Sequence, residues 1–98
     1  MSKRKDSSSL LTGYWAMSHE EREQHDAQLL DAQRLQLLSA EKRKSYIEAL
    51  STHTLIGCSI TFEMLNNPDY FNYQAHLHDV LTSLLDRQET LSRYLDNL

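Results

Sequence analysis

Apolar side chains recur every three or four residues along the last third of the chain, and this spacing predicts a long amphipathic helix. Eight of the nine positions in this heptad stripe are apolar or aromatic. Such a stripe keeps one helix face toward a partner over about eight turns. Leu81, Leu85 and Leu95 widen it, which favours a helix in a bundle over a narrow two-stranded coiled coil. The nine positions are Tyr70, Tyr73, Leu77, Val80, Leu84, Arg87, Leu91, Tyr94 and Leu98.

A second long helix is expected over about residues 40–66, with Ser39 as its N-cap. Between Thr54 and Phe62 the apolar residues alternate with small ones, which is the periodicity of a strand. The strongly helical flanks favour the helix. Its predicted buried face consists of Tyr46, Ala49, Leu50, His53, Ile56, Gly57, Ile60 and Met64.

Leu55 and Phe62 lie off that face, seven residues apart, beside a row of small hydroxyl residues. Small side chains let another helix approach closely, so these positions predict a second contact surface, within the chain or between subunits. The row consists of Ser45, Thr52 and Ser59.

The first helix is expected over about residues 19–38, because Ser18 and Glu21 have the spacing of a capping box. Its first two turns are almost wholly polar, so we expect that end to fray or project. Asn67 and Pro68 form a helix start for the third helix, which should run over about residues 68–96.

These patterns predict an all-α fold: a three-helix arrangement built on a long helical hairpin, with its core completed as a homodimer. Only two glycines and one proline are present, which disfavours many short strands with sharp turns. Residues 1–9 are predicted to be a disordered basic tail, and residues 10–98 a single helical domain.

Seven residues are candidates for a protein interface. Tyr14 and Trp15 either cap the end of the bundle or dock a partner, since both are common interface anchors. Arg87 interrupts the apolar stripe, so it either lifts its charge to water or forms an ion pair with Glu48, Glu63 or a second subunit. The full set is Tyr14, Trp15, Leu55, Phe62, Tyr73, Arg87 and Tyr94.

The formal net charge of −4 gives no general attraction to nucleic acid or anionic lipid. The local exception is the basic run Lys42, Arg43 and Lys44, which is a candidate nucleic-acid contact. The single Cys58 excludes an intrachain disulfide and suits a reducing compartment, so a cytoplasmic location is expected. The uncharged stretch 49–62 is too short and too polar to span a membrane, and no cleavable signal peptide is expected.

No catalytic or nucleotide motif is present, and neither enzyme activity, a cofactor nor a metal site is expected. His76 and His78 point away from each other on a helix, and His76 with Asp79 supplies only two ligands. We therefore expect a non-catalytic protein-binding regulator or adaptor, such as an inhibitor, an antiactivator or a chaperone-like subunit. The alternatives are a small DNA-binding regulator using the basic run, and a metal-binding protein using His76 and Asp79.

Overall fold

The protein is all-α in the computed structural model, which describes residues 10–97 and has no strand among them. This confirms the prediction that the fold is all-α, while the homodimer stays a prediction. The expected disordered tail over residues 1–9, and Leu98 at the end of the stripe, lie outside the described residues. The elements in chain order are the 3-10 helix η1 (Gly13–Ala16), α2 (His19–Leu29), α3 (Ala32–Gln36), α4 (Ala40–Leu65), the 3-10 helix η2 (Pro68–Tyr73) and α5 (Gln74–Asp96).

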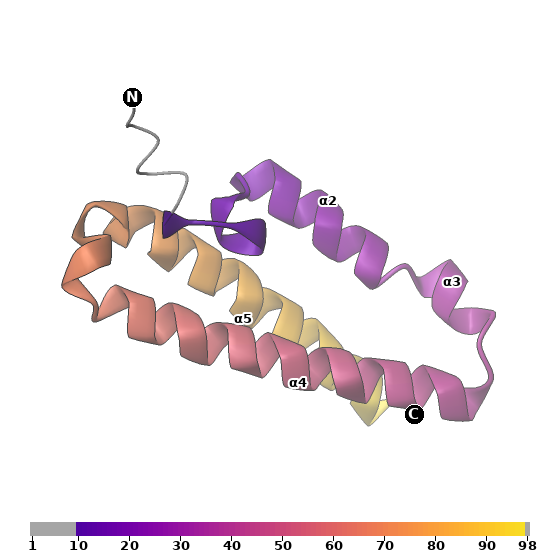
Figure 1. The fold of residues 1–98 in the computed structure, drawn as a ribbon. Helices are drawn as coiled ribbons and strands as arrows, with labels where there is room; N and C mark the ends of the chain where they lie inside the picture. The colour runs from indigo at the N-terminus through magenta and orange to yellow at the C-terminus, as the bar shows by residue number, and fades with distance from the viewer. Residues whose placement is uncertain (1–9, 98) are drawn as a thin grey trace.

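Helices α4 and α5 form a long antiparallel hairpin, and the shorter helices α2 and α3 lie along one side of it (Figure 1). The core of the hairpin is the predicted stripe of α5. Four of its residues are at most 2% exposed, namely Leu77, Val80, Leu84 and Leu91. Burial of these aliphatic side chains drives the pairing of the two helices.

The buried face of α4 differs from the predicted one. Gly57 is buried as predicted, but Ile56, Ile60, Ala49 and His53 of the predicted face are exposed. Ile47, Thr54 and Thr61 are buried in their place. The physical reason is close packing against α5. A Cβ atom added to Gly57 would lie 3.5 Å from both Cδ atoms of Leu84, so the leucines of α5 fit against the small residues of α4.

The first predicted helix is broken in two. The capping box is present, because the Glu21 amide donates to Ser18 Oγ and the Ser18 amide donates to Glu21 Oε1. However, α2 ends at Leu29, and Asp31 caps the separate helix α3 by accepting a hydrogen bond from the Gln33 amide. Aspartate is more favourable as a helix N-cap than inside a helix, because its side chain accepts hydrogen bonds from nearby backbone amides.

Helix α4 begins at its predicted cap, whereas α5 begins later than the predicted start at Pro68. Ser39 accepts from the Lys42 amide at the start of α4, and α4 is helical through the segment with strand periodicity. Asn67 accepts from the Asp69 amide, but the chain then forms η2, kinked at Tyr70, and α5 begins only at Gln74. Among residues 10–97, no helix is long and apolar enough to cross a membrane.

Candidate protein-interaction surface

The segment that carries Tyr14 and Trp15 is bound to the hairpin of the same chain. The indole N–H of Trp15 donates to Thr61 Oγ1 at 2.7 Å. Its carbonyl oxygen lies 2.6 Å from Nε2 of His76, and this imidazole nitrogen must be the donor because a carbonyl only accepts. The indole thus reaches α4 and the carbonyl reaches α5, so Trp15 lies across one end of the hairpin.

Tyr14 belongs to a polar cluster between α2 and α5. Its hydroxyl donates to Asp26 Oδ2 at 2.7 Å, and Arg87 Nη1 donates to Asp26 Oδ1 at 2.9 Å. The guanidinium carbon of Arg87 lies 5.1 Å from the centre of the Tyr14 ring, within reach of a cation–π contact. Tyr14 and Arg87 are therefore both engaged in contacts within the chain.

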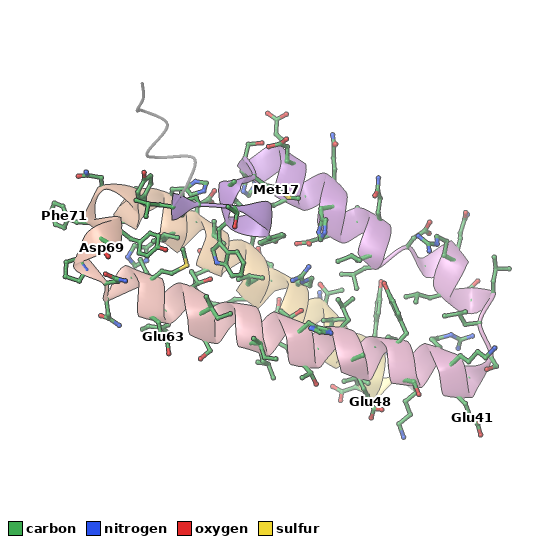
Figure 2. The ribbon with its side chains drawn as sticks, in the orientation of Figure 1. Met17, Glu41, Glu48, Glu63, Asp69 and Phe71 are labelled. Carbon is green, nitrogen blue, oxygen red and sulfur yellow. The ribbon has the colours of Figure 1, made fainter. Side chains whose placement is uncertain are left out.

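Arg87 forms an ion pair, but its partner is not one of the expected glutamates. Neither Glu48 nor Glu63 pairs with it, because its side chain is buried against α2 and meets Asp26 there. Glu48 and Glu63 project from the side of α4 that is turned away from α2 (Figure 2).

Arg22 is a buried residue that the sequence reasoning missed. It is fully buried where a frayed, projecting helix end was expected. Its Nε donates to Ser83 Oγ at 3.0 Å, its Nη1 to the Met17 carbonyl at 2.6 Å, and its Nη2 to Asp79. A buried guanidinium with these partners fixes α2, and the turn before it, on α5.

These contacts are indicated in the sequence by the one-turn spacing of charged and polar residues on α2 and α5. On α2 the positions 22 and 26 are one turn apart, and on α5 so are 79, 83 and 87. The charges match across the interface, since Arg22 meets Asp79 and Asp26 meets Arg87. Complementary polar ladders on two helices can thus replace an apolar face.

Burial and the hydrogen bond to Asp26 raise the pKa of the Tyr14 phenol well above its ordinary value of about 10, although Arg87 opposes the shift. The unfolded chain then releases this proton near pH 10 while the folded chain keeps it. Stability from Tyr14 is therefore present below pH 10 and lost as the pH rises further. We expect Tyr14→Phe to flatten the fall in urea-unfolding free energy between pH 9 and pH 11. Equal slopes for both proteins would contradict this assignment.

The other two aromatic candidates also have partners in the chain. The hydroxyl of Tyr94 donates to the Leu30 carbonyl at 3.4 Å, and the rings of Tyr73 and Tyr70 have centroids 6.3 Å apart. Both candidates are half-buried. Tyr94 thus links α5 to the end of α2, whereas the contact of Tyr73 with Tyr70 lies within η2.

Leu55 and Phe62 are exposed, and they share the outside of α4 with two isoleucines. The exposed fractions are 53% for Leu55, 51% for Ile56, 41% for Ile60 and 61% for Phe62. They lie in the stretch 49–62, which carries no formal charge. We call Leu55 and Phe62 the outer row of α4, and Ile56 and Ile60 its isoleucine row.

Grooves flank the shorter helices. One of about 450 Å³ lies between α2 and α5, with Glu23 and Asp86 beside Ala27 and Leu30 in its walls. Another, of about 360 Å³, lies beside α3, and half of its lining residues are leucines.

The basic run at the start of α4 is partly used for folding. Arg43 donates from Nε to the Leu35 carbonyl and from Nη2 to the Leu38 carbonyl, and so satisfies the end of α3. Lys42 and Lys44 are exposed. Two of the three basic side chains of this run are thus exposed and available for contact with a nucleic acid.

The side chains considered as metal ligands, His76 and Asp79, are bound to other residues of the chain. Asp79 pairs with Arg22 and His76 binds the Trp15 carbonyl, so these two do not face a common ion. Within residues 10–97, no group of three or more His, Cys, Asp and Glu side chains is placed to hold a metal ion. Burial raises the pKa of the Cys58 thiol, which lowers its nucleophilicity at neutral pH.

Comparison of the chain with protein-family models, with curated proteins and with solved structures gave no match.

Proposed function

We propose that this chain is a small non-catalytic protein-binding regulator or adaptor that acts through the exposed face of α4. The supporting observation is the pair of apolar rows on an uncharged stretch of this helix. Each large apolar side chain contributes about 1.5–3 kcal/mol when it is fully buried. A contiguous exposed patch of such residues typically marks an interaction site.

The isoleucine row is the surface for the regulated protein. Ile56 and Ile60 are four residues apart, so they lie on one side of the helix and fit a groove in a partner. The proposal includes a homodimer, which would cover the outer row, and a cytoplasmic location, where the single Cys58 would stay reduced.

The test is photo-crosslinking in cells from a light-activated residue at position 60, with the captured protein identified by mass spectrometry. We expect one protein to predominate among the captured species. We expect Ile56→Asp, with the crosslinker kept at position 60, to reduce capture at least about tenfold, since it places a charge in an apolar contact.

Leu85→Asp is the matched control, because Leu85 is an equally exposed apolar residue on α5. It should leave capture and the melting temperature unchanged. Capture that is equal in all three proteins would contradict the proposal.

Treatment with nuclease distinguishes the protein-binding function from the alternative, a DNA-binding regulator. Recovery of the captured protein should survive it. Loss after nuclease, together with salt-dependent retention on DNA that Lys42→Glu and Lys44→Glu abolish, would favour a DNA-binding regulator using Lys42 and Lys44.

A further inference from the structure

The groove between α2 and α5 has carboxylates and apolar side chains in its walls. We propose that it binds a basic, partly apolar segment of another protein, with a lysine or arginine at Glu23 and Asp86 and an apolar side chain against Ala27 and Leu30. No residue of α4 lines this groove, so it is a second binding surface, independent of the function proposed for the exposed face of α4.

The ion pairing between α2 and α5 leaves two carboxylates of the groove without a lysine or arginine. Asp26 also lines the groove, but Arg87 Nη1 donates to its Oδ1 at 2.9 Å and neutralises it. Glu23 and Asp86 are exposed, and neither forms an ion pair with a lysine or arginine within residues 10–97. His19 Nε2 lies 3.4 Å from Glu23 Oε2 and adds a positive charge only when it is protonated.

The exposed charges around the groove have the same negative sign. The formally charged residues that α2 exposes are three glutamates, because its arginine, Arg22, is fully buried. The exposed arginine of α5 is Arg93, which lies beyond the groove residues 83–90 and is 3.9 Å from Glu89. Charge complementarity therefore selects a basic occupant and acts against an acidic one.

A buried donor in the same wall indicates that the occupant also carries an oxygen atom. Arg87 lines the groove, its side chain is 8% exposed, and its Nε has no hydrogen-bond partner among residues 10–97. A buried N–H without an acceptor costs free energy, so an oxygen atom supplied by an occupant stabilises the complex. The backbone carbonyls of a peptide segment are such acceptors, whereas a simple polyamine has none.

The spacing along α2 gives the spacing of residues in the bound segment. Ala27 and Leu30 follow Glu23 by four and seven residues. These separations are about 6 Å and 10 Å along the helix axis. In an extended segment, residues two or three positions apart span about the same distances. The segment therefore has an apolar residue at the second or third position from its lysine or arginine.

The first test is a titration of the full chain with a fluorescent peptide made of Lys-Lys-Ser-Leu repeats, read by anisotropy. We expect saturable binding. Glu23→Gln with Asp86→Asn should raise the Kd about tenfold, because the exposed ion pairs with the peptide are lost. A peptide of Glu-Glu-Ser-Leu repeats should not bind. Equal binding of the two peptides would overturn the proposal.

Glu48→Gln with Glu63→Gln is the matched control, because it removes the same charge from α4. Both glutamates are exposed and project from the side of α4 that is turned away from α2 (Figure 2). The Kd for the basic peptide should stay within about twofold of the unchanged value, since charges far from the bound peptide are screened by salt. Equal weakening by the two double variants would show a response to net charge alone and would overturn the groove.

Ala27→Trp tests the groove without any change of charge. Ala27 is exposed, so the indole fills the groove instead of entering the core. We expect the melting temperature to be unchanged and the Kd for the basic peptide to rise at least about tenfold. An unchanged Kd would mean that the peptide binds elsewhere, which would overturn the proposal.

Amide chemical shifts identify the occupied surface. On addition of the basic peptide we expect shifts within residues 19–30 and 83–90 and none within residues 55–62. Shifts confined to α4 would overturn the proposal. So would shifts within residues 19–30 that appear without peptide when Lys3, Arg4 and Lys5 are changed to glutamine, because the chain's own basic run would then be the occupant.

The two binding surfaces can fail separately. Capture from position 60 should be the same in the unchanged chain and in Ala27→Trp. Absence of capture, together with peptide binding that depends on Glu23 and Asp86, would contradict the proposed function and support the groove. Capture that depends on Ile56, together with no peptide binding, would support the proposed function and overturn the groove.

Discussion

Leu84→Asp is expected to leave the chain largely unfolded at 25 °C. Leu84 is 2% exposed, and its Cδ atoms lie where a Cβ atom added to Gly57 of α4 would be in van der Waals contact with them. Loss of a buried leucine alone typically costs about 2–5 kcal/mol, and an unpaired carboxylate in the same place costs more. Domains of this size have about 5–10 kcal/mol of stability in total. Far-UV circular dichroism during heating should show weak helical signal without a cooperative transition.

The adjacent residue provides the control. Leu85 is 54% exposed, so Leu85→Asp adds the same charge one position further along α5 but in contact with water. Its melting temperature should stay close to that of the unchanged protein, since surface substitutions usually alter stability by less than about 0.5 kcal/mol. Similar melting of the two variants would show that the assignment of the core face of α5 is wrong.

The orientation of α5 toward the core was predictable, because its apolar residues form one long stripe on a single face of the helix. Leu77, Val80 and Leu91 are buried as expected from their spacing. A helix with one apolar face has one way to bury it.

The buried face of α4 was not predictable from hydrophobicity, because this helix has apolar residues on several sides. Ile56 and Ile60 favour the predicted face, yet both are exposed, whereas Thr54 and Thr61 are buried. The hydroxyl of Thr61 donates to the Gly57 carbonyl, so burying it leaves no unpaired donor. The large leucines of α5 select the face with small residues, and that choice depends on the partner helix.

The contacts of α2 were missed for another reason. A polar helix was expected to project, because burial was judged from apolar residues alone. Arg22 and Arg87 are nevertheless buried, since each finds an acid on the facing helix. Tyr14 and Arg87, which were predicted as interface residues, make contacts within the chain, and the proposed interface adds the isoleucine row to Leu55 and Phe62.

The ion pair of Arg22 leads to the second large effect, which is that Asp79→Asn should destabilise the protein by about 3 kcal/mol. Arg22 is fully buried and its guanidinium carries a positive charge, so loss of the carboxylate leaves a buried charge without its counter-ion. Removal of one partner from a buried pair typically costs about 3–5 kcal/mol. The lower end is expected because the Asp79 side chain is 43% exposed.

A double-mutant cycle distinguishes this ion pair from a general effect of position 79. In an Arg22→Met background no buried charge needs Asp79, so Asp79→Asn should then cost less than about 1 kcal/mol. The difference of about 2 kcal/mol or more is the coupling energy, measured by urea unfolding of the four proteins. Equal costs in the two backgrounds would mean that the pair does not hold α2 on α5. The hydrogen bonds of Arg22 to Ser83 and Met17 would then have to supply that attachment, because they remain when the carboxylate is lost.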